Sequence, residues 1–193
     1  VADRLGDRTA RMLGRVTLNP LRHIDPLGTV LLPLGMYALT GFLFGWAKPV
    51  PVNPRNLARP RRDMAIVAAA GPLSNLAMAA LWSVAIVLGA WLYPINDWAG
   101  APLFYTGAAG VLINVILLVL NMVPLPPLDG GRVLVGLLPA RLARVVARVE
   151  PYGLFILVAL LVTGVLGRLV FPFVIGVIQL LPGSRAVLEL FMT

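Results

Sequence analysis

The sequence contains no cysteine and only one histidine, His23, among its 193 residues. Without cysteine, disulfide bonds and cysteine-ligated zinc sites are excluded. His23 lies two residues before Asp25. One histidine, even together with an aspartate from a distant part of the chain, is too few for a catalytic zinc site, which takes three protein ligands. We therefore interpret His23 as a hydrogen-bonded structural histidine.

Charged residues are also scarce, at 12%, whereas 59% of the residues are hydrophobic and the mean hydropathy is +0.90. Soluble domains average about 45–50% apolar residues. The excess predicts an integral membrane protein. The net charge of +8 comes from arginines that cluster between apolar runs, which favours a positive-inside bias and a lipid bilayer over a nucleic-acid partner.

Two uncharged runs, residues 66–92 and 103–123, are long enough to span a membrane, since about 20 residues suffice. Residues 27–47 are apolar but broken by proline and glycine, and we interpret them as re-entrant or interfacial, with a true span as the alternative. Residues 151–184 as one straight helix would reach about 51 Å, far beyond a hydrocarbon core of about 30 Å. We expect this run to break near residues 167–172, into two short membrane helices or into one span plus a re-entrant piece, so that it holds one or two membrane helices.

Basic residues concentrate in segments 48–62 and 132–148, which predicts that both are cytoplasmic and that 93–102 lies on the other side. Within the second segment, residues 139–149 have arginines on one face and aliphatic residues on the other, as in an interfacial helix. Residues 14–26 and 48–54 look extended, because they combine strand-favouring residues with prolines.

The predicted fold is therefore an all-α polytopic membrane domain covering residues 1–193. It has about four or five membrane helices or re-entrant segments, with short extended or β segments near its N-terminus, where residues 1–26 are polar.

Asp129 ends a long apolar run and precedes Gly130, Gly131 and Arg132. It can cap a helix or pair with Arg132. It can equally be a metal ligand or proton carrier, because an ionisable group at membrane depth is costly and usually functional. The sequence alone leaves these alternatives open.

Three asparagines occur in the predicted spans: Asn75 in one, and Asn114 and Asn121, seven residues apart on one helical face, in the other. Buried asparagines commonly join helices. They can also line a polar pocket and hydrogen-bond a substrate backbone or an oxyanion.

Four stretches resemble the site-2 protease family of intramembrane zinc metalloproteases, in its compact bacterial form without a PDZ domain. They are LGDRTARMLGRVTLNPLRHIDPLGT (5–29), GWAKPVPVNPRN (45–56), GPLSN (71–75) and NMVPLPPLDGGR (121–132). The resemblance is nearly collinear from residue 1 to about 135. It implies that Asp129 is the third zinc ligand and that the active site is lined by Asn75, Asn114, Asn121, Pro124, Gly130 and Gly131.

In that family the other two zinc ligands are the histidines of an HExxH helix, whose glutamate is the general base. That motif does not occur in these 193 residues, and we expect it just upstream of Val1. The resemblance implies a zinc-dependent intramembrane endopeptidase that cleaves transmembrane or membrane-proximal substrates. It further implies the bacterial cytoplasmic membrane, with the active site towards the cytoplasm.

Two other functions remain open on the sequence. A non-catalytic homologue that binds transmembrane partners agrees with the missing HExxH, and the sequence encoded directly upstream would discriminate it from a protease. A transporter is disfavoured, because the chain is short, has no inverted repeat and has one acid near a span.

The ligand count predicts that the 193-residue polypeptide alone neither binds stoichiometric zinc nor cleaves peptides, because it offers one family-type ligand and no general base. Zinc content and proteolysis of the purified polypeptide would test this. Tight one-to-one zinc with turnover would contradict it.

Overall fold

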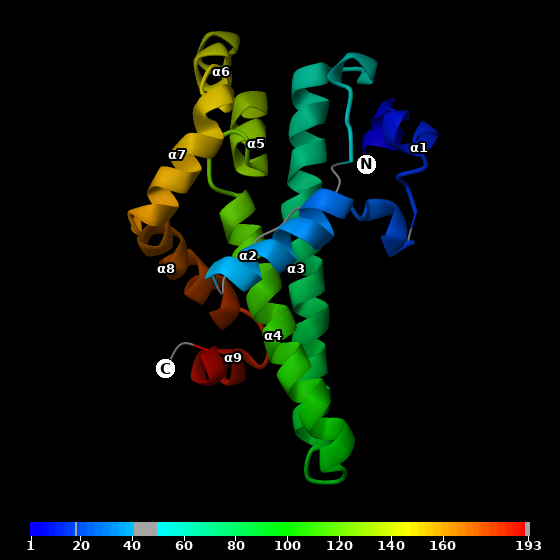
Figure 1. The fold of residues 1–193 in the computed structure, drawn as a ribbon, viewed down its shortest axis with the longest axis vertical. Helices are drawn as coiled ribbons and strands as arrows, with labels where there is room; N and C mark the ends of the chain where they lie inside the picture. The colour runs from blue at the N-terminus through cyan, green and yellow to red at the C-terminus, as the bar shows by residue number, and fades with distance from the viewer. Residues whose placement is uncertain (18, 41–49, 192–193) are drawn as a thin grey trace. The chain divides into compact units, whose positions relative to one another are not determined.

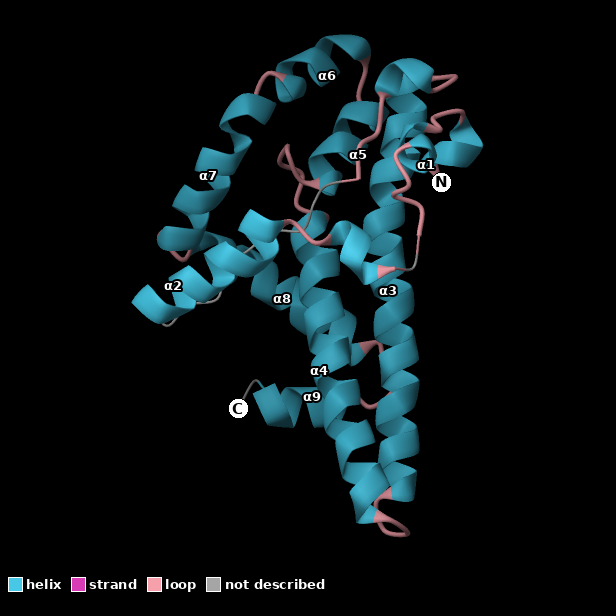
Figure 2. Ribbon diagram, turned by 45° about the vertical axis from the view of Figure 1, so that its right-hand side comes forward, coloured by secondary structure: helices cyan, strands magenta, loops and turns pink. Residues whose placement is uncertain are grey.

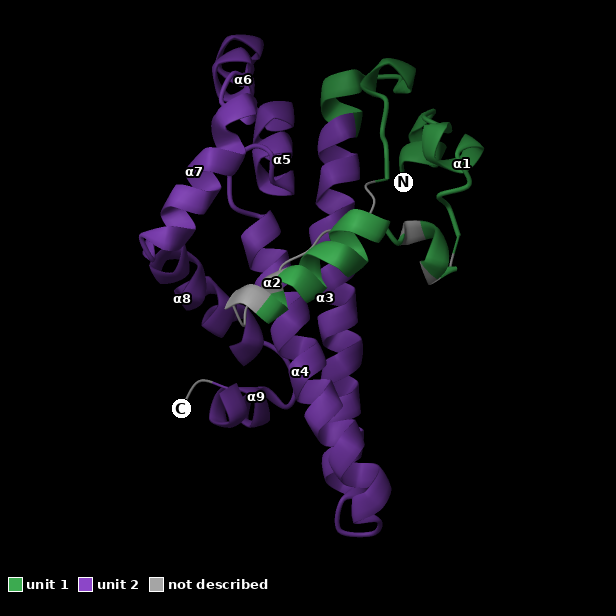
Figure 3. Ribbon diagram, in the orientation of Figure 1, with its two compact units in different colours: residues 1–63 green, residues 64–193 purple. Residues whose placement is uncertain are grey.

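The computed structural model describes residues 1–17, 19–40 and 50–191, and over these ranges it contains helices and loops but no strand (Figures 1 and 2). The all-α prediction is thereby confirmed for the described residues. The chain forms two compact units, Val1–Asp63 and Met64–Thr193 (Figure 3). The prediction of one protease-type domain stays a prediction.

The first unit consists of short helical elements, three of which begin at Asx–Pro pairs. The Asn19 side chain accepts a hydrogen bond from the Leu21 N–H, and the Asp25 carboxylate accepts one from the Leu27 N–H at 3.0 Å. Proline at the first helical position suits this arrangement, because its fixed φ is helical and its missing N–H is not needed there. The elements are η1 (Ala2–Leu5), α1 (Thr9–Met12), η2 (Pro20–His23), η3 (Pro26–Leu31), α2 (Leu32–Thr40) and η4 (Pro54–Asn56).

The predicted extended segments are not confirmed. Segment 14–26 contains the 3-10 turn η2, and the described part of segment 48–54 has no regular structure before η4 begins at Pro54. The prolines start helical turns here instead of marking strand edges. Segment 27–47 is helical through Thr40 in η3 and α2; the remainder of it, and the side chain of His23, lie outside the described residues. Whether this segment re-enters or spans stays a prediction.

Asp7 joins the two ends of the first unit. Its side chain is 1% exposed. Its carboxylate accepts hydrogen bonds from the backbone N–H of Asn53 at 2.8 Å and from the side-chain amide of Asn56 at 2.9 Å. It also accepts from the backbone N–H of Thr9 at 3.1 Å. Hydrogen bonds from the Thr9 hydroxyl and then the Asn56 amide lower the pKa of Asp7, against the opposing effect of burial.

The second unit contains the two long helices predicted as spans. They are α3 (Pro60–Leu92), whose first four residues belong to the first unit, and α4 (Asp97–Asn121). Both are long and apolar enough to cross a membrane. The predicted spans 66–92 and 103–123 fall on these helices, but each helix begins six residues earlier than predicted, and α4 ends two residues earlier. The Asn96 side chain caps α4 by accepting from the Ala99 N–H at 3.3 Å.

Helices α3 and α4 pack backbone against backbone. A Cβ added to Gly107 would lie 2.9 Å from the backbone nitrogen of Ile86, and one added to Gly89 would lie 2.5 Å from that of Phe104. In lipid, small residues drive such packing, because apolar side chains gain little by leaving acyl chains for each other. The hydrophobic core forms on this hairpin and includes residues of α8 (Val165–Gln179) and α9 (Ser184–Phe191). Its buried residues are Ala79, Ile86, Ala108, Val111, Val115, Val174, Ile178 and Val187.

Between α4 and α8 lie α5 (Asp129–Leu137), α6 (Ala140–Ala147) and α7 (Glu150–Val162). The helix predicted over 139–149 is observed as α6, over 140–147, and its place at a membrane surface stays a prediction. The chain bends by 60° between α6 and α7. If this bent pair of helices forms a single span, it is the third possible span. The described residues thus hold two or three possible spans, and the predicted four or five are not confirmed.

The predicted break in segment 151–184 is real but misplaced. It falls at Thr163–Gly164, between α7 and α8, whereas Pro172 lies inside α8. Gly164 has φ +72°, a left-handed conformation that glycine adopts without steric penalty. The stop signal is therefore the glycine and not the proline.

We predict that Asp7→Ala releases segment 53–56, because four donors lose their acceptor. The measurement is hydrogen exchange at the Asn53 amide in the full chain, where protection should fall to that of an exposed loop. Asp3→Ala, which removes an exposed ion pair to Arg11 at 3.3 Å, serves as the control and should leave Asn53 protected.

The hydrogen bonds that the Asp7 carboxylate accepts are expected to depend on pH. Because the pKa of Asp7 is lowered on folding, the stabilisation is complete above the ordinary value of about 4 and declines as the pH falls below it. Protection that is unchanged in Asp7→Ala, or that increases on acidification after correction for the intrinsic exchange rate, would contradict the role of Asp7.

Candidate functional site

The loop between α4 and α5 folds back on the start of α5, and two glycines permit this. A Cβ added to Gly130 would lie 2.5 Å from the carbonyl carbon of Met122, and one added to Gly131 would lie 2.5 Å from that of Leu125. Any side chain at either position would therefore collide with backbone, which cannot rotate away. The glycine pair after Asp129 has a steric reason that the sequence alone did not reveal.

Asp129 is the first residue of α5 and does not cap it. The N-cap is Leu128, and no side-chain cap bond forms. The capping interpretation is therefore wrong. Instead the side chain of Asp129 reaches the GPLSN motif: a Cβ added to Gly71 would lie 2.8 Å from its Oδ2. Residues 71 and 129 are far apart in sequence, and the fold places this carboxylate against α3 at a position without a side chain.

The carboxylate is half-buried. Burial raises the pKa of Asp129, and the positive charge of Arg132 opposes this rise. The ion pair of Arg132 is made with Glu150 on α7, Nη2 to Oε1 at 3.6 Å. The alternative that Asp129 simply pairs with Arg132 is thus not observed. Glu150 was not singled out in the sequence, where it looks like one more charge in a basic loop.

The three asparagines fall into two groups. The Asn114 side chain donates to the carbonyl of Gly110 at 2.8 Å, within its own helix. Asn75 lies one turn beyond Gly71 on α3, so helical geometry puts both on the same face. Asn121 ends α4 directly before Met122, against which Gly130 packs. Asn75 is thus one helical turn from the contact between Gly71 and Asp129, and Asn121 adjoins the residue against which Gly130 packs.

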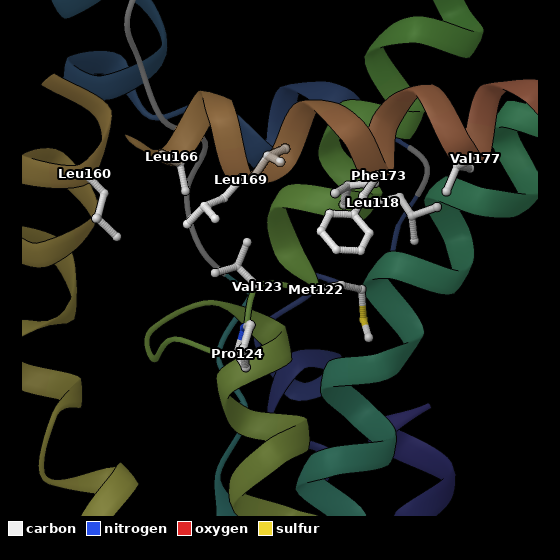
Figure 4. Close-up of a pocket in the computed structure, with 11 residues that line it drawn as sticks. Leu118, Met122, Val123, Pro124, Leu160, Leu166, Leu169, Phe173 and Val177 are labelled. Atoms are coloured by element: carbon white, nitrogen blue, oxygen red, sulfur yellow. The ribbon is translucent and has the colours of Figure 1, made fainter. Parts of the chain in front are cut away.

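Pro124 lines an apolar cavity of about 470 Å³ beside this loop (Figure 4). The cavity lies between the end of α4, the end of α7 and one face of α8. Its lining carries no charged residue and consists of Leu118, Val119, Met122, Val123, Pro124, Leu160, Leu166, Leu169, Val170, Phe173 and Val177. The Met122–Pro124 backbone thus has the cavity on one side and the start of α5 on the other.

The donor set near Asp129 is too small for a catalytic zinc site. Among the described residues, no three His, Cys, Asp or Glu side chains gather closely enough to hold a metal. These residues supply one carboxylate where three protein ligands are needed. A zinc ion at Asp129 would require further ligands from outside the described part of the chain.

Comparison with known proteins identifies a family. The Peptidase family M50 model matches residues 96–164, which include α4, the loop and Asp129. The chain is 36% identical over 196 aligned positions to "Putative zinc metalloprotease YwhC" of Bacillus subtilis, covering 99% of this chain and 82% of that protein.

Two proteins named "Putative zinc metalloprotease Rip2" are also similar. The one from Mycolicibacterium smegmatis is 34% identical over 89% of this chain, and the one from Mycobacterium tuberculosis is 32% identical over 81%. The chain spans 62% and 57% of their respective lengths. No solved structure gives a significant match.

The apolar helices make this an integral membrane protein. The match to YwhC covers almost the entire chain and most of that relative. The chain therefore belongs to peptidase family M50, the site-2 protease family of zinc metalloproteases.

Proposed function

We propose that this chain forms the larger part of a zinc-dependent intramembrane endopeptidase in which Asp129 is one metal ligand. The observation that carries the proposal is the seating of the Asp129 carboxylate against Gly71. An acidic group costs free energy in an apolar setting and is kept there mainly for function. Here the backbone of α3 leaves it room, and no cap bond or described ion pair accounts for it.

The remaining ligands and the general base come from outside the described residues, because these offer one carboxylate at the site. By resemblance, an HExxH helix supplies them in the intact protein. Bound zinc activates water and polarises a carbonyl in hydrolases of this kind. The proposed role of the described residues is to hold one carboxylate in position and to form the surroundings of the scissile peptide.

Asn75 and Asn121 are proposed to hold the substrate backbone. A transmembrane helix must unwind before it can be hydrolysed, since its amides and carbonyls are bonded to each other. Once unwound, those groups need new partners in an apolar environment. The structure assigns no hydrogen bond to either asparagine side chain within the described residues, whereas Asn114 is already bonded to Gly110. Asn114 is therefore the weakest of the three candidates.

The apolar cavity beside Met122 and Pro124 supports a membrane-embedded substrate, because its lining offers no polar partner to a soluble peptide. The basic segments at 48–62 and 132–148 support the cytoplasmic side of a bacterial cytoplasmic membrane for the Asp129 end of the molecule. A transmembrane protein is accordingly the proposed substrate and lipid the surrounding solvent.

The direct test is Asp129→Ala in the intact protein. We expect cleavage of a transmembrane reporter to be lost and zinc affinity to fall at least about tenfold, as when a supporting metal contact is removed. Asp129→Asn, which keeps the shape and removes the charge, should behave similarly. Both variants should fold, because the side chain makes no described hydrogen bond.

The matched control is Asn114→Ala, whose side chain bonds only within α4 among the described contacts. It should retain zinc and most of the cleavage. Full activity and unchanged zinc in Asp129→Ala would reject the ligand role.

A second prediction concerns Gly71. In Gly71→Ala the new Cβ would lie 2.8 Å from Asp129 Oδ2, and the carboxylate must rotate away. Because the obstacle is the end of a flexible side chain, stability should change by no more than about 1 kcal/mol, the helix-propensity difference. Activity of the intact protein should fall about a hundredfold, the cost of a misplacement of about 1 Å.

Gly176→Ala is the control for helix propensity, since a Cβ there meets nothing within 4 Å. It should leave kcat/KM unchanged. Equal activity in Gly71→Ala and Gly176→Ala would show that the position of the Asp129 carboxylate does not matter for catalysis.

A further inference from the structure

Helix α6 has one packed side and two exposed ones. Ala143 is buried, and α6 packs against α5. On a second side, Leu142 and Val145 are 54% and 60% exposed, and Leu137 at the end of α5 is 78% exposed. Exposed aliphatic side chains at adjacent positions are costly in water and call for an apolar cover.

The third side of α6 carries an arginine ridge, which we define as Arg141, Arg144 and Arg148. They recur at intervals of three and four residues and therefore lie along one face. All three are exposed. Within the part of the chain that the structure describes, none of them makes an ion pair, and the nearest carboxylate along the chain, Glu150, pairs with Arg132. The guanidinium of Arg144 reaches the Ala140 carbonyl at 3.3 Å.

The position of α6 along the chain relates these two sides to a membrane. After α6 the chain turns by 60° into the apolar α7, which contains no charge after its first residue. The three arginines of α6 are costly inside the hydrocarbon core, so if α7 enters the membrane, the bend lets α6 lie along the surface. Aliphatic residues on one side and arginines on the next then match acyl chains and phosphates.

We propose that the α6 arginine ridge binds the headgroups of anionic phospholipids, while Leu137, Leu142 and Val145 enter the acyl region of the same leaflet. Three adjacent positive charges without a described counter-ion attract an anion, and the neighbouring aliphatic residues favour a lipid over a nucleic acid or an acidic peptide. Arginine matches phosphate through paired N–H donors. The proposal is independent of the proteolytic function.

The first test counts bound lipids by native mass spectrometry. The purified full chain in detergent receives phosphatidylglycerol or phosphatidylcholine with identical acyl chains. The wild type should retain phosphatidylglycerol in preference. Replacing all three arginines by glutamine should lower its affinity about a hundredfold, since each basic residue near an anionic surface contributes about fivefold, and raising the salt concentration should reduce the wild-type preference.

Arg185→Gln on α9 is the control for general loss of positive charge and should keep the preference. Equal phosphatidylglycerol binding by the triple variant and the wild type would overturn the proposal. So would an equal loss in Arg185→Gln, or binding of a second copy of the chain in place of lipid.

The second test uses the absence of cysteine, which makes any introduced thiol unique. One spin label is attached at Leu142→Cys and another at Ala147→Cys, which lies on the other side of the arginine ridge from Leu142. Both report access to oxygen and to a polar nickel chelate in phosphatidylglycerol vesicles. The label at 142 should favour oxygen and the label at 147 the chelate. Equal access of the chelate to both positions would overturn the membrane placement even if the triple variant lost lipid.

Discussion

The structure around Asp129 depends on close contacts that three glycines allow, two between backbones and one between the backbone of α3 and the Asp129 carboxylate. Gly130 and Gly131 let the loop after α4 lie directly on the first turn of α5. Gly71 leaves space on α3 for the carboxylate that this turn presents. With side chains at positions 130 and 131, α5 would start elsewhere, and with one at position 71 the Asp129 carboxylate would rotate away from α3. The polar chemistry of the site therefore rests on the absence of side chains next to it.

The α3–α4 hairpin supplies the rigid frame for this arrangement. Its two helices approach closely at Gly89 and Gly107, and the core that forms on the hairpin includes residues of α8 and α9. Asn75 and Asn121 are fixed by this frame, because one lies in α3 and the other ends α4. The Arg132–Glu150 pair joins the start of α5 to the start of α7. Two of the candidate site residues thus lie on helices whose positions are set by apolar packing.

The two long apolar helices, the short helix α6 and the family could be predicted from the sequence, because apolar length, helical periodicity and motif order are local properties of the chain. The break at Gly164 was predicted too far along the chain, because Pro172 is the stronger stop signal in the sequence. In the structure Pro172 lies inside the apolar helix α8. The expected extended segments contain helical turns, because asparagine and aspartate before proline act as caps. The contact between Gly71 and Asp129 could not be predicted, because it depends on how distant segments pack.

The most direct test of this account joins residues 71 and 129 covalently in the cysteine-free chain. Gly71→Cys with Asp129→Cys should form a disulfide rapidly under mild oxidation, because a Cβ at position 71 would lie 3.9 Å from Cγ of Asp129, the atom whose place a cysteine sulfur would take, so that a small side-chain rotation brings the two sulfurs into bonding distance. Leu73→Cys with Asp129→Cys places the first thiol on the opposite, exposed face of α3 and should remain reduced. Rapid cross-linking of the first pair alone is the result we predict; no cross-link, or equal cross-linking of both pairs, would contradict the seating of Asp129 against α3.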